Sequence, residues 1–203
     1  MTSRDHFELD AMVADLGVLV ECESPSRDID RLSQHAQLVS DLMVRLLGSA
    51  PELIDSPVGP HIHWRGGADP RVLILGHHDT VHPVGTLARL PFAVRDNMAF
   101  GPGVFDMKAG IIQAIYGLSE IRECEQVEIL ISSDEEIGSY TSRELIEARA
   151  LATGNVLVLE PSGNDDALKI ARKGVGTFTV DIVGRASHAG LEPEKGINAL
   201  MEL

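Results

Sequence analysis

The sequence has few cysteines and few basic residues, and both shortages exclude classes of protein. Cys22 and Cys124 form no CxxC motif and no disulfide framework, so we expect two reduced thiols without a zinc-thiolate role. Lysine and arginine number 17 against 31 aspartate and glutamate residues, which gives a formal net charge of −14. Nucleic acids and anionic membranes bind preferentially to basic surfaces, so this acidic composition argues against both as partners.

The sequence also lacks a long hydrophobic run and a signal peptide. No segment approaches the ~20 apolar residues of a membrane-spanning helix, and residues 1–6 lack the basic-then-apolar layout of a secretory signal. We therefore place the protein in the cytoplasm. Its 203 residues, 44% of them hydrophobic, are enough for one good-sized core or for one domain plus part of another.

Apolar residues at helical spacing predict amphipathic helices that cover a sheet. These helices are expected over residues 7–20, 28–47, 108–122 and 139–150, and a last one from about Ile197 to Leu203. Gly48 supplies a C-terminal stop for the second. Short strands are expected at 52–54 and 61–64. We interpret His61 and His63, which share one strand face, as an exposed pair on an edge strand, because no acidic residue adjoins them.

Three further strands each end in residues that can bind a metal ion. Residues 72–75 lead into His77-His78-Asp79, residues 127–131 into Asp134-Glu135-Glu136, and residues 156–159 into Glu160. In open α/β sheets ligands bind beyond the carboxyl ends of the strands, and neighbouring strands are only ~4.8 Å apart. These side chains can therefore converge on one small volume.

A histidine with several carboxylates forms an oxygen-and-nitrogen ligand set. Such a set fits zinc, with some overlap to cobalt or manganese. His77 is the candidate ligand, and Asp79 the carboxylate that holds its imidazole in place. Asp106 lies at the entry to the 108–122 helix, and the residues alone leave two interpretations open: an N-terminal helix cap or a further metal ligand.

The sequence pattern changes after Glu160. Residues 169–171 and 177–183 are strand-like, and the alternation in the second segment predicts an antiparallel strand with one solvent-exposed face. We place a domain boundary near Gly174. The predicted fold is α/β: a mixed, mainly parallel sheet flanked by helices in a catalytic metal-binding domain over residues 1–173, followed by the beginning of a smaller α+β domain over residues 174–203.

The order of these motifs resembles a known enzyme family. The motifs are His77-x-Asp79, Gly101-Pro-Gly-x-x-Asp106-Met107-Lys108, Asp134-Glu135-Glu136-x-Gly138 and Glu160-Pro161. They resemble those of the di-zinc metallopeptidases that include glutamate carboxypeptidase, acetylornithine deacetylase, succinyl-diaminopimelate desuccinylase and the aminoacylases. The resemblance runs from about Arg71 to the last residue, and the stretches 134–139 and 184–190 look most like the glutamate carboxypeptidase branch.

The resemblance implies a ligand set for two zinc ions. His77 ligates one zinc ion and Glu160 completes its site, Glu136 ligates the other, and Asp106 bridges both. Asp106 is therefore interpreted as a ligand rather than as a cap. The resemblance further implies a cis peptide bond between Asp106 and Met107.

The remaining residues are assigned to the chemistry. Two metals ~3.5–4 Å apart can share a water and lower its pKa, and the resemblance makes Glu135 the general base that moves its proton to the leaving amine. Adjacent residues on an extended backbone point in opposite directions, so Glu136 can ligate while Glu135 stays free. Asp79 is implied to orient His77. His188, in the smaller lid domain of a homodimer, is implied to help stabilise the oxyanion from a partner subunit.

The implied activity is hydrolysis of an amide bond next to a free carboxylate, in a small peptide or N-acyl amino acid. Two alternatives stay open: an N-acyl-amino-acid deacylase of the acetylornithine deacetylase or desuccinylase type, and a non-catalytic, metal-binding or dimerising remnant. We also expect the chain to be an incomplete enzyme, because its last helix lacks a stop signal and no histidine after His188 supplies the further ligand found in the family. Weak or single-zinc binding and negligible turnover are then expected of this chain alone.

Overall fold

The structure is a computed structural model that describes residues 8–121, 123–163, 165, 167–171 and 173–201. The chain divides into two compact units, Met1–Pro161 and Ser162–Leu203. Some positions named in the sequence predictions lie outside the described residues: His6, Phe7, Arg122 and Leu203.

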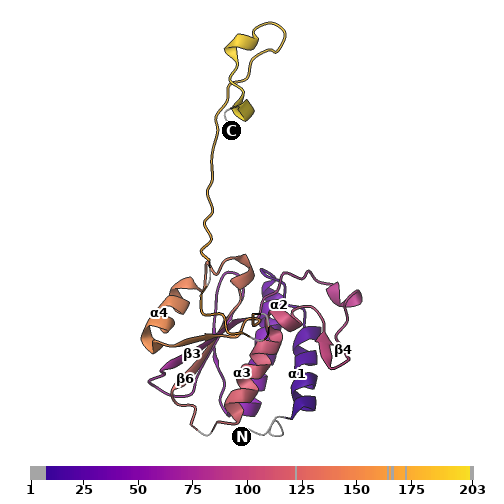
Figure 1. Ribbon diagram of the computed structural model, residues 1–203, viewed down its shortest axis with the longest axis vertical. Helices are drawn as coiled ribbons and strands as arrows, with labels where there is room; N and C mark the ends of the chain where they lie inside the picture. The colour runs from indigo at the N-terminus through magenta and orange to yellow at the C-terminus, as the bar shows by residue number, and fades with distance from the viewer. Residues whose placement is uncertain (1–7, 122, 164, 166, 172, 202–203) are drawn as a thin grey trace. The chain divides into compact units, whose positions relative to one another are not determined.

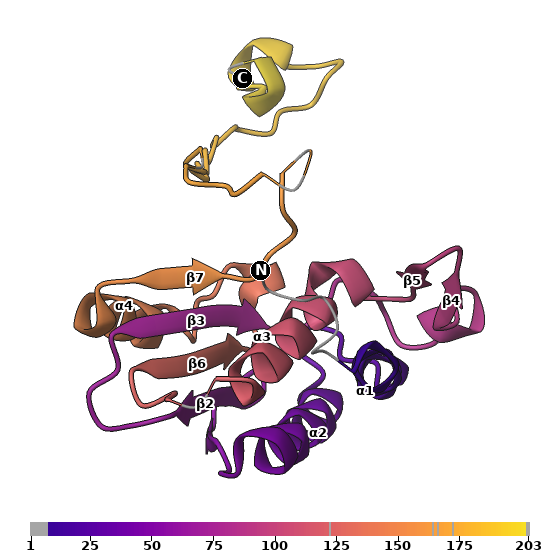
Figure 2. The same cartoon turned by 60° about the horizontal axis from the view of Figure 1, so that its bottom comes forward.

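A mixed five-stranded sheet forms the centre of the first unit (Figure 2). Its strands lie in the order β1-β2-β6-β3-β7, with the bounds β1 (Glu52–Ile54), β2 (His61–Arg65), β3 (Val72–His77), β6 (Val127–Ser132) and β7 (Val156–Val158). β3 pairs in parallel with β6 and β7, whereas β2 pairs antiparallel with β1 and β6. The three parallel strands are those predicted to end in metal-binding residues.

A small hairpin accompanies this sheet. It consists of β4 (Ala93–Arg95) and β5 (Met98–Phe100), which pair antiparallel. The turn residues Asp96 and Asn97 both have positive φ, as the two-residue hairpin turns that match strand twist require.

Helices cover both faces of the sheet, which confirms the predicted mixed sheet flanked by helices. In Figure 1, α1 (Leu9–Glu21), α2 (Ile29–Leu47) and α3 (Ala109–Ser119) lie on one side of the sheet, and α4 (Arg143–Thr153) lies on the other. The first three match the predicted helices apart from their ends. The fourth begins later than predicted, because Ser139 has a φ of +54° that no α-helix accommodates. None of the helices in the described ranges combines the length and apolar character that a membrane span requires.

The bounds of α2 follow from its capping residues. The Asp28 side chain accepts a hydrogen bond from the backbone N–H of Arg31 at 3.2 Å and so satisfies one of the free donors of the first turn. Gly48 ends the helix with a φ of +78°, a left-handed conformation that glycine adopts without steric cost. The predicted stop at Gly48 is confirmed.

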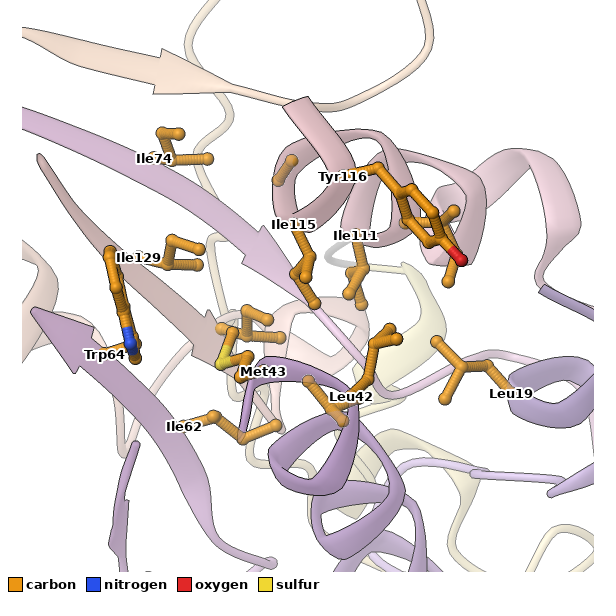
Figure 3. Packing of buried hydrophobic residues seen from close by; sticks show 14 of the residues in the cluster. Leu19, Leu42, Met43, Ile62, Trp64, Ile74, Ile111, Ile115, Tyr116 and Ile129 are labelled. Atoms are coloured by element: carbon orange, nitrogen blue, oxygen red, sulfur yellow. The ribbon is translucent and has the colours of Figure 1, made fainter. Parts of the chain in front are cut away.

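The hydrophobic core lies between the sheet and the three helices α1, α2 and α3 (Figure 3). Strand residues that face these helices include Ile62, Trp64, Ile74 and Ile129, and helix residues that meet them include Leu19, Leu42, Met43, Ile111 and Ile115. Complete burial of one such side chain stabilises a fold by ~1.5–3 kcal/mol. This packing holds the strands in place, so the residues beyond their carboxyl ends have a rigid support.

The second unit differs from the prediction. Its described residues include two short helical turns, Pro193–Lys195 and Ala199–Met201, and an isolated bridge between Arg185 and Ile197. The strands predicted over 169–171 and 177–183 are wrong, since none of their residues that the structure describes lies in β structure. Alternation alone does not make a strand, because its backbone N–H and C=O groups need a neighbouring strand as partner. The helix expected from Ile197 is a single turn over its described residues.

Candidate metal centre

The candidate site lies where three parallel strands end. β3 runs parallel to β6 and β7, so the carboxyl ends of all three lie at the same edge of the sheet. His77, the last residue of β3, is in register with Ser132, the last residue of β6. The segments that follow β6 and β7 bring Glu135, Glu136 and Glu160 to this edge.

His77 is the side chain on which the site converges. Its imidazole is 1% exposed, and its Nε2 atom lies 3.0 Å from Asp106 Oδ1, 3.3 Å from Glu160 Oε1 and 4.0 Å from Glu135 Oε2. The opposite nitrogen, Nδ1, lies 2.9 Å from the backbone oxygen of Asp79. A carbonyl oxygen can only accept, so Nδ1 donates to it, and the lone pair of the neutral ring is left on Nε2.

The charge around His77 strongly favours a positive charge at Nε2. Burial opposes protonation of the ring, but the carboxylates of Asp79 and Glu160, with the charge of Glu135, raise the pKa of His77 to about 11. The carboxylates themselves repel one another. Burial raises the pKa of Glu135 and of Glu136, and the neighbouring carboxylates raise both further against the opposing effect of His77. A cation at this point, whether a proton or a metal ion, would relieve that repulsion.

Side chains converge in two overlapping groups, and within each group the ligand atoms all lie within 4.8 Å of one another: His77 with Glu135 and Glu160, and His77 with Asp106 and Glu136. Zinc takes nitrogen and carboxylate ligands at ~2.0–2.2 Å in a tetrahedral arrangement, so two of its ligand atoms are roughly 3.4 Å apart. The distances from His77 Nε2 to Asp106 and Glu160, 3.0 and 3.3 Å, are close to this spacing. Glu135, at 4.0 Å, lies farther off than either. The donor set therefore fits a zinc ion.

Asp79 connects His77 to the loop that carries the two glutamates. Its side chain is fully buried, and its Oδ1 lies 3.4 Å from His77 Nδ1. The backbone N–H groups of Glu135 and Glu136 donate to its two oxygens at 3.2 and 3.3 Å, and the Ser26 hydroxyl donates at 2.7 Å. Burial works against the charged form, but His77 and Ser26 keep the pKa of Asp79 below its usual range. One carboxylate thus fixes groups from three segments of the chain.

Asp106 reaches the site from an irregular turn, Val104–Lys108, that precedes α3. The peptide bond between Asp106 and Met107 is cis, as predicted. The cap of α3 is Lys108, which makes no capping side-chain hydrogen bond, so the interpretation of Asp106 as a helix cap is wrong. Gly76 permits the close approach of this turn to β3, because a Cβ atom there would lie 2.9 Å from the Met107 Cε atom.

Glu135 and Glu136 lie on a short 3₁₀ helix, Glu135–Ile137, and not on extended backbone as predicted. Successive side chains of such a helix are about 120° apart, so the two carboxylates still point in different directions. Asp134, just before them, is buried and ties this turn to the start of α4. Its carboxylate accepts the backbone N–H and the hydroxyl of Thr141, both at 2.7 Å, and the hydroxyl of Ser142 at 2.6 Å.

The interpretation of His61 and His63 as an exposed pair on an edge strand is wrong. β2 lies between β1 and β6, and both imidazoles are buried. His63 Nε2 lies 3.0 Å from the carboxylate of Glu128, which also binds Arg149 of α4 at 2.9 Å. The partner is far away in sequence, so a search for adjacent acidic residues misses it. The available signal was Glu128 itself, since a charged residue inside an apolar strand needs a buried partner.

His61 supports the loop after β6. Its Nδ1 accepts the backbone N–H of Ser133 at 3.2 Å, and its Nε2 lies 3.2 Å from the Thr141 hydroxyl. His188 belongs to the second unit, where its Nδ1 accepts the backbone N–H groups of Gly190 and Leu191. Its predicted catalytic role stays a prediction.

The chain is similar in sequence to known proteins. The sequence model described as Peptidase family M20/M25/M40 matches residues 73–202. Carboxypeptidase G2 from Pseudomonas sp. (strain RS-16) is 34% identical over 208 residues, which cover 96% of this chain and 49% of the relative. Succinyl-diaminopimelate desuccinylase 2 from Shewanella loihica is 29% identical over 148 residues, which cover 64% of this chain and 39% of the relative. The chain thus spans half or less of the length of these relatives.

A solved structure shares the fold. Aminopeptidase PepT from Bacillus cereus superposes with a TM-score of 0.64 over 95% of this chain and 54% of its own. At 19% sequence identity, this likeness concerns the arrangement of sheet and helices.

Proposed function

The chain belongs to peptidase family M20/M25/M40, and from this we propose that it carries the metal centre of a metal-dependent hydrolase that cleaves an amide bond next to a free carboxylate. The substrate class is a small peptide or N-acyl amino acid, with glutamate at the carboxylate end as in a glutamate carboxypeptidase. The relative named Carboxypeptidase G2 supports this choice, since its similarity extends over 96% of the chain.

One observation carries the proposal. A buried imidazole, His77, presents one nitrogen to carboxylates from three different segments while its other nitrogen is held by the residue two positions on. Carboxylates gathered around a single histidine repel one another unless a cation balances their charge. We propose that His77, Asp106, Glu136 and Glu160 hold two zinc ions, for which cobalt or manganese can substitute.

Glu135 is the proposed general base. A divalent cation, when bound by these residues, would supply Lewis acidity for the amide carbonyl and the attacking water. Glu135 takes the proton from that water and returns it to the nitrogen of the leaving amine, a role that typically contributes about 10²–10⁴-fold in rate. Three features support the assignment: its carboxylate stands 4.0 Å from His77, its pKa is raised toward the working range of a base, and its side chain is half exposed.

A second candidate is an N-acyl-amino-acid deacylase. The desuccinylases among the relatives favour it, because one of them is 29% identical over 64% of this chain. The two activities share the metal centre and the base and differ in what surrounds the acyl group. A third candidate is a metal-binding or dimerising remnant without turnover.

Further parts of the proposal concern the whole protein. We infer a cytoplasmic location and a homodimer in which His188 of the second unit donates to the oxyanion. The acidic net charge of −14 favours a small substrate over nucleic acid as partner.

The test combines metal analysis with a substrate panel. The 203-residue chain, alone and extended by the coding sequence that follows it, is assayed with zinc against N-acyl-glutamates, other N-acyl amino acids and succinyl-diaminopimelate. We expect the extended form to prefer N-acyl-glutamates and to lose activity when a chelator removes the metal. A preference for the succinylated substrate would favour the deacylase, and zinc binding without turnover in both forms would favour the remnant.

A further inference from the structure

The segment between α1 and α2, residues 22–28, lies beside the metal centre although it precedes the matched region 73–202. Pro25 forms a parallel bridge with Thr80, three residues beyond His77. The backbone N–H of Thr80 donates to the backbone oxygen of Ser24 at 2.9 Å, and the backbone N–H of Ser26 donates to the backbone oxygen of Thr80 at 3.2 Å. This connector thus pairs, through one isolated bridge, with the segment that directly follows β3 and its metal-binding residues.

Two serine hydroxyls of the connector make different contacts. Ser24 Oγ donates to the backbone oxygen of His78 at 2.6 Å. Ser26 Oγ donates to Oδ2 of Asp79 at 2.7 Å, and its alternative acceptor, the backbone oxygen of Thr80, lies at 3.4 Å. A hydroxyl has one proton to donate, and a bond to a carboxylate is shorter and stronger than one to a carbonyl. The Ser26 proton therefore goes to Asp79.

The connector is anchored independently of this bond. Lys108 Nζ, two residues after Asp106, donates to the backbone oxygens of Leu19 and Cys22 at 2.8 and 3.0 Å. Glu23 accepts the backbone N–H groups of Gly85 and Leu87 at 2.8 and 3.0 Å. With these contacts in place, loss of the Ser26 hydroxyl does not release the segment, so its effect on Asp79 can be isolated.

Both oxygens of the Asp79 carboxylate accept hydrogen bonds. Oδ1 receives the backbone N–H of Glu135 and faces His77, while Oδ2 receives the backbone N–H of Glu136 and the Ser26 hydroxyl. The Ser26 bond is the shortest of these contacts. Without it, Oδ2 keeps only a 3.3 Å bond in a buried environment, and the carboxylate is held less firmly in the geometry that supports the glutamate loop and faces His77.

We propose that Ser26 is a positioning residue of the metal centre: its hydroxyl fixes the Asp79 carboxylate, which in turn holds the Glu135–Glu136 loop and keeps its negative charge facing His77. This inference rests on the proposed metal centre. Outer partners of metal ligands typically contribute ~10–100-fold to metal affinity. Ser26 acts through Asp79, so we expect the lower end of that range.

The experiment measures zinc affinity by competition with a chromophoric chelator, together with the thermal midpoint of the metal-free protein. Three variants are compared with the parent: Ser26→Ala, Ser26→Thr, which keeps the hydroxyl, and Ser24→Ala, which removes a hydroxyl from the same connector without touching Asp79. We expect Ser26→Ala to weaken zinc binding about 10-fold, Ser26→Thr to restore most of it, and Ser24→Ala to lower the thermal midpoint while binding zinc within about twofold of the parent.

Two results would overturn the inference. One is a Ser26→Ala protein with parental zinc affinity. The other is an equal loss of affinity in Ser24→Ala and Ser26→Ala, or no recovery in Ser26→Thr, which would show that only the general stability of the connector matters. Should Ser26→Ala fail to fold, Ser26→Cys, with a weak donor of similar size, must bind zinc less tightly than Ser26→Thr. Absence of zinc binding by the parent itself would contradict the proposed function and not this inference alone.

Discussion

Glu135 and Glu136 are neighbours in the chain, yet their carboxylates enter different groups of converging side chains: Glu135 joins Glu160, and Glu136 joins Asp106. The short 3₁₀ helix on which they lie turns them apart. The proposed division of labour between a free base and a ligand can therefore be tested by changing each carboxylate in turn.

Glu135→Gln should remove hydrolysis and leave metal content near that of the parent. The amide keeps the shape of the side chain but cannot accept the proton, so we expect turnover to fall by about 10²–10⁴-fold. The measurement is the initial rate on an N-acyl-glutamate, in the form of the protein shown to be active, with zinc quantified on the same sample. Glu136→Gln is the matched comparison and should lose metal as well as activity. Parental turnover in Glu135→Gln would rule out its role as base.

Asp134→Ala should destabilise the loop that carries both glutamates. The change leaves the donors of Thr141 and Ser142 without their buried acceptor, and loss of such charged hydrogen bonds costs about 2–3 kcal/mol. Urea unfolding of the metal-free protein measures it. Asp134→Asn, which keeps one acceptor oxygen, should lose less. An Asp134→Ala protein as stable as the parent would show that these contacts contribute nothing net.

Glu23 should make the stability of the fold depend on pH in the acid range. The backbone N–H of Gly85, and then that of Leu87, hold the pKa of Glu23 below its ordinary value of 4.5 despite its burial. Because the folded form binds this proton less readily than the unfolded chain does, the stabilisation is complete above pH 4.5 and is lost as the pH falls through the lower, folded pKa.

The measurement is the free energy of unfolding of the parent and of Glu23→Gln at pH 7 and near pH 3.5. We expect the parent to be the more stable at pH 7 and the difference to shrink in acid. Glu21→Gln, an exposed glutamate at the end of α1, serves as control and should show a much smaller difference at both values. A difference that stays constant with pH would show that Glu23 contributes through packing alone.

Much of the site could be predicted because its signals are local. Each of the three strands is a mainly apolar run, and the polar residues follow it closely, so one parallel sheet edge brings His77, Glu135 and Glu160 together. The Asp28 and Gly48 ends of α2 are equally local. The order of the strands in the sheet, with the antiparallel β2 beside β6, could not be read in this way.

The contacts that were missed join residues far apart in the chain. His63 finds Glu128 only because β2 pairs with β6, and Ser26 finds Asp79 only because the connector runs beside the end of β3. The residues adjacent in sequence to His63 and to Ser26 do not indicate these partners. The prediction of a strand over 177–183 is wrong for a related reason. The alternation is a local signal, whereas a strand also needs a neighbouring strand to pair with, and that pairing is not local.

The most direct test of the account is zinc binding by the purified chain, measured by chelator competition and by metal analysis, with His77→Ala and Asp106→Ala beside the parent. His82→Ala, a nearby histidine outside the converging groups, is the control. The account predicts that the parent and His82→Ala bind zinc with the same affinity, and that His77→Ala and Asp106→Ala lose it by on the order of 100-fold or more. Equal zinc affinity in the parent and in His77→Ala, or no binding by the parent at all, would contradict it.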